Sequence, residues 1–465
     1  MNQTAKMENP YTRGMAAFVA NLRYEDIPEE VRARIKLLLL DTLGCGIYGS
    51  LPAHSKILIR TMAKVDESKA CAVWGTRNRL SAPHAALVNG SMTQGFELDS
   101  MHSRAIMHIG SETVPALVAA AEVKPGISGK KFLAAAVAGY EIGPRVGLCM
   151  GQGHLAQGWH CGTKGVYSSA ASAASAFGLS EEQTVHALGI AGTQAAGLMA
   201  AQFGSMVKRM HAGRAAQSGL YGALLAEEGY TGIQNVFESD YGGYCTTFSR
   251  SKDRFDMNEL TKGLGKEFET MRDSLKFYSC AASNHATLDA VRMIRDRHPF
   301  KVEDVEKITA YASYLVLEHV GWKYNPIGLT AAQMNLPFCV ATLLLEGDVF
   351  VKQFTEDVVH NPARIALADK VEVIEDPAVT AKGAGSRYEV RVEVRLKDGS
   401  VHEQHVEAAR GSDKKFASEA EVMDKFRKLV SNVLPASQVE QIGETVLKLE
   451  KLDDASSLAK MLALA

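Results

Sequence analysis

One short stretch of the sequence gathers side chains that exchange protons near neutral pH. Asp99, His102 and His108 fall within ELDSMHSRAIMHIGSE (97–112). Three explanations are open: a metal site, an acid–base site, or a solvated polar loop. Three possible ligands without repeated spacing or a nearby cysteine make a weak metal site. Histidine is the usual proton carrier, and a neighbouring carboxylate fixes its tautomer, so the pattern favours acid–base chemistry.

The spacing of these residues gives a first idea of their placement. Asp99 and His102 are three residues apart, so on a helix they would share one face. His108 lies six residues beyond His102, and Gly110 and Pro115 indicate that a new helix begins nearby. We therefore expect His108 in a loop at a helix N-terminus, where backbone N–H groups attract anions.

Two further stretches place ionisable side chains among small residues. GWHCGTKG (158–165) carries His160, either a ligand to substrate or an ordinary capped loop residue. In GSMVKRMHAGRAAQSGLYGALLA (204–226), Lys208, His211 and Arg214 recur every three residues among alanines and glycines. A buried cation needs a partner, and a substrate carboxylate would serve; the alternative is a structural ion pair.

The last candidate stretch is LKFYSCAASNHATLDAVRMI (275–294), where the character of the sequence changes. Asn284 is a plausible N-cap for a helix that begins near His285, so His285 is expected to be structural. Lys276 precedes that helix and would reach across an interdomain cleft, a preferred place for ligand sites.

The elements that position these residues divide the chain in two. Residues 12–250 are dominated by helical spacing and are rich in Ala, Gly and Ser, which lets helices pack closely. VEKITAYASYLVL (305–317) predicts a strand, AAQMNLPFCVATLLLEGDV (331–349) a helix, and RYEVRVEVRLKDGSVHEQHVEA (387–408) a β-hairpin. We predict a mainly α protein with a large all-helical domain, residues 1–272 and 412–465. It is interrupted by a smaller α+β lid domain, residues 273–411, that contains the antiparallel β-hairpin.

Bulk properties exclude several classes of partner. The 465 residues have a formal net charge of −2 and no long run of one sign, which argues against nucleic acid or an anionic membrane. No stretch of eighteen apolar residues and no secretory signal is found, and seven scattered cysteines suggest reduced thiols, so we expect a cytoplasmic protein. The G-x-G-x-x-G, G-x-x-x-x-G-K-[ST], G-x-S-x-G and H-E-x-x-H motifs are absent, and no cofactor is expected.

Four ordered stretches together resemble the MmgE/PrpD family, which includes 2-methylcitrate dehydratase, cis-aconitate decarboxylase and iminodisuccinate epimerase. They are ELDSMHSRAIMHIGSETVPALVAAAE, KRMHAGRAAQSGLYGALLAEEGYTG, LKFYSCAASNHATLDA and AAQMNLPFCVATLLLEGDV. The resemblance runs over almost the whole chain. It implies a helical domain with a smaller lid, a homodimer, and catalysis without a metal.

The resemblance also implies roles for individual residues. It makes Asp99 the active-site aspartate, and it places His102 and His108 on the D-x-x-H and H-P-G positions. His160 matches the histidine of a glycine-bounded loop, Lys208 the lysine before the H-x-G motif, and Lys276 the lysine leading the lid. The catalytic candidates are therefore Asp99, His102, His108 and His160, and the substrate-binding candidates are Lys208, His211, Arg214 and Lys276.

Three positions depart from the family pattern. Ser100 replaces a common second acidic residue, and Ile109 replaces the usual proline. Ala281 stands where the decarboxylase branch carries a histidine, which argues against decarboxylation. These departures also support the alternative of a non-catalytic homologue that binds a polycarboxylate.

The chemistry shared by the family is removal of a proton from the carbon next to a carboxylate. We expect a metal-independent, dehydratase-like lyase acting on a small di- or tricarboxylate, or an epimerase of an imino- or hydroxy-dicarboxylate. His108 or His160 would be the base, and Asp99 with His102 would orient it or return the proton. The lysines, with Arg214, would hold the carboxylates and stabilise the developing charge.

Overall fold

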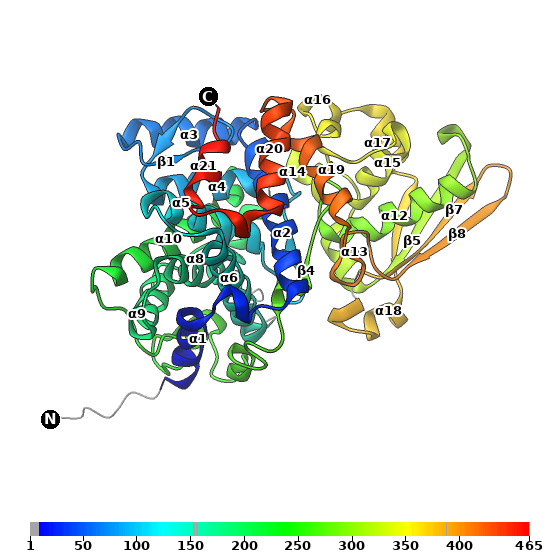
Figure 1. Cartoon of the computed structure of the whole chain (residues 1–465). Helices are drawn as coiled ribbons and strands as arrows, with labels where there is room; N and C mark the ends of the chain where they lie inside the picture. The colour runs from blue at the N-terminus through cyan, green and yellow to red at the C-terminus, as the bar shows by residue number, and fades with distance from the viewer. Residues whose placement is uncertain (1–8, 152–153, 155–156, 204, 387, 465) are drawn as a thin grey trace.

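The computed structural model describes residues 9–151, 154, 157–203, 205–386 and 388–464. Residues 1–8, on which part of the exclusion of a secretory signal rests, lie outside the described residues. The described chain forms a larger helical body and a smaller body with a sheet, which lie side by side in Figure 1. The predicted fold class, mainly α with a smaller α+β part, is confirmed.

The larger body takes helices from both ends of the chain. They are α1 (Pro10–Asn21), α2 (Glu29–Tyr48), α3 (Ala53–Val65), α4 (Ala82–Thr93), α5 (Ile109–Val123), α6 (Gly129–Met150), α8 (Gly162–Phe177), α9 (Glu181–Gly192), α10 (Met210–Glu227), α11 (Tyr244–Ser249), α19 (Glu419–Val430), α20 (Ala436–Leu447) and α21 (Ser456–Met461). Two short strand pairs join them, β1 (Cys71–Ala72) with β2 (Arg79–Leu80), and β3 (Met101–His102) with β4 (Asp273–Ser274). C-terminal helix α19 packs against α2, so the chain returns to its first body after the smaller one.

Small residues bring the central helices of the larger body close together. A Cβ on Gly90 of α4 would lie 2.7 Å from the Cα of Gly213 in α10. A Cβ on Gly143 of α6 would lie 1.7 Å from the hydroxyl of Ser168 in α8. Larger side chains at these crossings would push the helices apart, which explains the alanine- and glycine-rich sequence.

The smaller body, called the lid here, contains a four-stranded sheet with the strand order β6-β5-β7-β8. Its strands are β5 (Val305–Ala312), β6 (Val371–Glu375), β7 (Val390–Leu396) and β8 (Val401–Val406), and its helices are α12 (Ala282–Arg297), α13 (Tyr314–Val320), α14 (Leu329–Met334), α15 (Leu336–Glu346), α16 (Glu356–Val359), α17 (Pro362–Ala368) and α18 (Pro377–Ala381). The predicted hairpin, β7 with β8, is antiparallel and confirmed. Strand β6 was not predicted and pairs in parallel with β5.

Local capping changes two of the predicted lid elements. The strand predicted for 305–317 ends at Ala312, because the Ser313 side chain accepts a hydrogen bond from the Val316 N–H and starts α13. The helix predicted for 331–349 is divided at Asn335, whose side chain caps α15 through the Phe338 N–H. Asn284, predicted as an N-cap, instead lies inside α12, which begins after Ala281.

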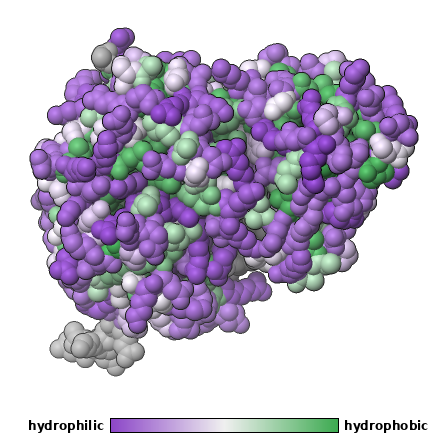
Figure 2. Space-filling model, turned by 45° about the vertical axis from the view of Figure 1, so that its right-hand side comes forward, coloured by the Kyte–Doolittle hydropathy of each residue, from purple (hydrophilic) through white to green (hydrophobic). Residues whose placement is uncertain are grey.

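Buried hydrophobic side chains form two separate cores. The first takes residues from Met15 to Phe277, Val351, and residues from Ala417 to Leu462, and the second lies between Tyr278 and Val406. Figure 2 shows a mostly hydrophilic surface with hydrophobic side chains in small separate groups, indented between the two bodies. No helix in the described part of the chain is both long enough and apolar enough for a membrane crossing.

Candidate functional site

A cavity of about 120 Å³ lies where the two bodies meet. The larger body contributes Glu97, His108, His160 and Lys208 to its wall, and the lid contributes Ser283, His319 and Tyr388. Lys276 comes from the crossover, the segment between β4 and α12 that links the two bodies. The structure therefore brings together four of the predicted site residues, although they come from four distant parts of the sequence. Asp99 lies directly behind this wall, in contact with His108.

An acidic loop between α4 and β3 supplies the carboxylates of the site. Glu97 has φ of 59°, a left-handed conformation that is unusual for a residue with a side chain. Its carboxylate forms ion pairs with Lys208 and Arg209, and Lys276 Nζ lies 3.7 Å from Oε2. Lys276 Nζ also lies 3.8 Å from Oδ1 of Asp99. Three cations thus face two carboxylates, leaving an excess of positive charge for an incoming anion.

The protonation states of these groups follow from their neighbours. Burial by itself would raise the pKa of Glu97, but the surrounding cations outweigh it and hold that pKa well below its usual range. Burial would likewise raise the pKa of Asp99, and His108 and Lys276 lower it below the usual value. Burial opposes the charge on Lys276, yet the two carboxylates raise its pKa. Glu97, Asp99 and Lys276 are therefore held in their ionised forms, whereas burial lowers the pKa of Lys208.

His108 and Asp99 form a buried acid–base pair. His108 is the N-cap residue of α5, as predicted from the sequence, and its Nδ1 lies 2.9 Å from Oδ2 of Asp99. The Ser111 hydroxyl donates to the same carboxylate oxygen at 3.1 Å. An ionised Asp99 holds the proton on Nδ1, which directs Nε2 to act as the basic nitrogen.

His160 is held as a neutral ring at the cavity wall. The Gly162 N–H donates to Nδ1 of His160 at 3.1 Å, so the ring proton belongs on Nε2. Burial first, and then the charges of His211, Lys208 and His108, lower the pKa of His160 well below its usual value. The His211 ring packs on His160 with centroids 4.2 Å apart. His160 is thus placed to donate a hydrogen bond rather than to carry charge.

The structure places three predicted site residues away from the cavity wall. His102 does not share a helix face with Asp99, because residues 101–102 form strand β3; its Nε2 contacts Glu269 at 3.0 Å, and its Nδ1 accepts the Ala105 N–H. Arg214 is exposed on α10, where it donates to Gln217. His211 stands behind His160 rather than on the cavity wall. Lys208, His211 and Arg214 therefore do not share one helix face directed at the cavity, because Lys208 precedes α10 and lies in a 3₁₀ turn.

Sequence reasoning missed Glu97 and Arg209, which are central to the charge network. Both stand in the stretches singled out above, Glu97 two residues before Asp99 and Arg209 directly after Lys208. Spacing does not identify them, since their pairing joins residues more than a hundred positions apart. The lid contributions of His319 and Tyr388 are also set by tertiary structure.

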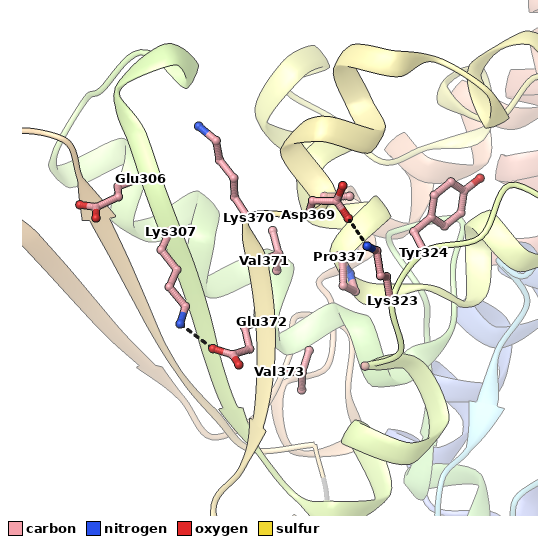
Figure 3. A pocket seen from close by; sticks show the side chains of 12 residues that line it. Glu306, Lys307, Lys323, Tyr324, Pro337, Asp369, Lys370, Val371, Glu372 and Val373 are labelled. Atoms are coloured by element: carbon pink, nitrogen blue, oxygen red, sulfur yellow. Dashed lines mark ion pairs between the residues drawn. The ribbon is translucent and has the colours of Figure 1, made fainter.

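A second, wider hollow lies on the lid, away from these residues. It is lined by parts of β5 and β6 and the segments beside them, and four of its charged side chains form two ion pairs (Figure 3). Lys307 contacts Glu372 at 2.6 Å, and Lys323 contacts Asp369 at 3.8 Å. Three lysines and three acidic residues line this hollow, so it lacks the excess positive charge of the first cavity. Within the described residues, no three metal-ligating side chains come together as a cation site.

Comparison with known proteins extends the likeness over both bodies. Models of the MmgE/PrpD N-terminal domain and C-terminal domain match residues 13–256 and 278–451. The cis-aconitate decarboxylase-like protein oryM of Aspergillus oryzae is 36% identical over 98% of this chain and 98% of its own length. Cis-aconitate decarboxylases of Aspergillus terreus and Homo sapiens are 33% and 27% identical, each over 97% of this chain, and over 95% and 94% of their own lengths.

Proposed function

Because the chain belongs to the MmgE/PrpD family, we propose that it is a lyase acting on a small di- or tricarboxylate at the carbon next to a carboxylate. The observation that carries the proposal is the His108–Asp99 pair beside a cavity lined by Lys208 and Lys276. A proton on such a carbon is only weakly acidic. Its transfer needs both a positioned acid–base group and positive charge for the enediolate that forms.

His108 is the acid–base residue in this proposal, and Asp99 is its orienting partner. With Nδ1 engaged by the carboxylate, Nε2 of His108 moves the proton at the reacting carbon. Asp99 stabilises the imidazolium that forms when Nε2 accepts a proton. One positioned acid or base of this kind contributes roughly 10²–10⁴-fold to a rate.

The lysines and His160 bind and stabilise the negative charge. Lys208 and Lys276 each pair with the substrate's carboxylates, and Nε2–H of His160 donates to an oxygen that gains charge. These groups are already held in place by Glu97 and the Gly162 N–H, so they need little rearrangement during the reaction. The proposal requires no metal, since the lysines provide the positive charge.

The names of the relatives favour cis-aconitate as the first substrate to test. In its decarboxylation, carbon dioxide leaves from the CH₂-bound carboxylate and the electron pair shifts the double bond. A proton from His108 then joins the carbon next to another carboxylate.

In the dehydratase alternative, His108 removes a proton from such a carbon and a β-hydroxyl leaves as water; in epimerisation, the proton returns to the other face. Ala281 favours the alternatives to decarboxylation, whereas the names of the relatives favour decarboxylation, and the products decide between them.

The test is to incubate the purified protein in D₂O with cis-aconitate, with citrate-class hydroxy acids and with imino-dicarboxylates. NMR then follows carbon dioxide loss, water loss and deuterium at the carbon next to a carboxylate. Turnover is expected with wild type, also in the presence of EDTA, and His108→Gln should reduce it by at least about 10². Binding without turnover or deuterium exchange would make the chain a polycarboxylate receptor and reject the lyase.

A further inference from the structure

Gln333 of α14 occupies the junction of the acidic loop, the crossover and the lid. It is 4% exposed, and its Nε2 donates to the Phe96 carbonyl at 2.9 Å. The same nitrogen lies 3.1 Å from both the carbonyl and the hydroxyl of Ser279. Its own backbone carbonyl accepts the Ala281 N–H at 3.0 Å, where α12 begins. One lid residue therefore contacts all three segments that frame the cavity.

The Phe96 carbonyl is the point at which the lid holds the acidic loop. Besides Gln333 Nε2, the Ser279 hydroxyl donates to it at 2.7 Å. Phe96 directly precedes Glu97, the residue in the left-handed conformation. Such a conformation costs free energy and persists only where its surroundings fix it. The two donors fix the peptide group on the N-terminal side of Glu97.

Arg209 connects the other end of the same residue to the lid. Its guanidinium pairs with the Glu97 carboxylate, and its Nη2 lies 3.2 Å from Oε1 of Gln333 and 3.3 Å from the Thr330 hydroxyl. Gln333 thus contacts Glu97 through the backbone on one side and through Arg209 on the other. The position of the lid and the direction of the Glu97 carboxylate are determined by one set of bonds.

We propose that Gln333 is a positioning residue that aims Glu97 at the lysines and holds the lid closed over the cavity as one coupled unit. The proposal builds on the proposed function only in taking the cavity as the substrate site. Loss of the Gln333 bonds frees the lid and lets Glu97 leave its left-handed conformation. The lysines then meet the substrate in a disturbed arrangement, which weakens binding more than the proton transfer at His108.

Thiol labelling gives a readout of lid closure that is independent of activity. All seven cysteines are buried in the described structure, and Cys161 lies on the cavity wall. In Gln333→Leu, which keeps the size of the side chain but cannot form hydrogen bonds, we expect Cys161 to react with a thiol reagent at least tenfold faster than in wild type. Mass spectrometry identifies the labelled cysteine. A tenfold increase in KM with a smaller change in kcat is expected on whichever substrate turns over.

Two further variants separate positioning from general loss of fold. Ser279→Ala removes the second donor to Phe96 while Gln333 stays, and should shift labelling and KM in the same direction by a smaller factor. Gln333→Glu keeps the acceptor for Arg209 but loses the donor to Phe96, and should not restore either value. Equal labelling of all cysteines with a lowered melting temperature in both Gln333→Leu and Ser279→Ala would assign Gln333 a merely structural role and overturn the proposal. Unchanged Cys161 labelling in both folded variants would overturn the proposal, whatever reaction the protein catalyses.

Discussion

Single residues in the cavity differ in what they do because their immediate contacts differ. His108 and His102 lie six positions apart, and both are paired with a carboxylate. His108 faces the cavity, whereas His102 is fully buried and binds Glu269 and a backbone N–H. The first is therefore placed for proton transfer, and the second for holding β3 to the segment that contains Glu269.

Substitution of Lys208 tests directly whether the lysines of the cavity wall bind the substrate's carboxylates. Its removal takes away a cation that pairs with Glu97 and faces the cavity. We expect Lys208→Ala to raise KM and lower kcat on the accepted polycarboxylate, with kcat/KM falling on the order of 10²-fold or more. Arg214→Ala is the comparison, because Arg214 lies on the exposed face of α10 and should change kcat/KM little. Steady-state kinetics of both variants check this. An equal change of kcat/KM in the two variants would refute the role of Lys208 in binding the substrate.

At the scale of elements, C-terminal helix α19 supports the acidic loop from behind. Lys425 is 1% exposed at its side chain, contacts Oδ1 of Asp41 at 2.5 Å and donates to the Leu98 carbonyl at 2.9 Å. Leu98 lies between Glu97 and Asp99 in the loop. A helix more than three hundred residues away in sequence thus fixes the backbone between the two carboxylates of the site.

Removing one partner of this buried pair should be strongly destabilising. Lys425→Met leaves the Asp41 carboxyl group buried without its cation, which is expected to lower the free energy of unfolding by about 3–5 kcal/mol. Lys428→Met, on the exposed side of the same helix, is the matched control and should change it by less than about 1 kcal/mol. Combining Lys425→Met with Asp41→Asn should recover most of the stability while kcat stays low, because the Leu98 carbonyl is still unsupported. Urea unfolding measures the stability and steady-state kinetics measure kcat. Full recovery of kcat in the double variant would contradict the role of Lys425 in supporting the acidic loop.

For the molecule as a whole, the crossing between the two bodies carries a buried carboxyl group that links folding to pH. Asp273 in β4 is fully buried, and its polar neighbours, the Ser100 side chain and the Ser274 backbone, offset only part of the cost of its charge. Burial raises its pKa from the ordinary value of 3.8 to about 8, and the nearby charges of Asp41 and Asp99 act in the same direction. The folded state therefore favours the protonated form.

The sign of the pH dependence follows from this upward shift. Below about pH 4 the stabilising contribution of protonated Asp273 is complete, and it is lost as the pH rises through about 8. Asp273→Asn cannot ionise, so its stability should fall less between pH 5 and pH 9, by a few kcal/mol, since one pKa unit corresponds to about 1.4 kcal/mol. Urea unfolding at pH 5, 7 and 9 checks this, with the exposed Asp296→Asn as control. Parallel curves for wild type and Asp273→Asn would show that the group is ionised in the folded protein.

Two statements about the whole molecule remain predictions. The family resemblance implies a homodimer, and the balanced charge and scattered cysteines predict a cytoplasmic protein without nucleic acid or membrane as a partner. Light scattering after size-exclusion chromatography tests the first, and fractionation of the source cells tests the second.

The sequence by itself determined the local features: the helix-rich body, the β-hairpin at Asp398-Gly399, and His108 at a helix N-terminus. These depend on periodicity, turn residues and capping, which act within a few positions of the chain. Only the tertiary structure separated His102 from the site and brought Glu97, Arg209 and Gln333 into it. Their roles rest on charge pairing and burial between residues more than a hundred positions apart, and no local pattern records which distant partner a buried polar side chain meets.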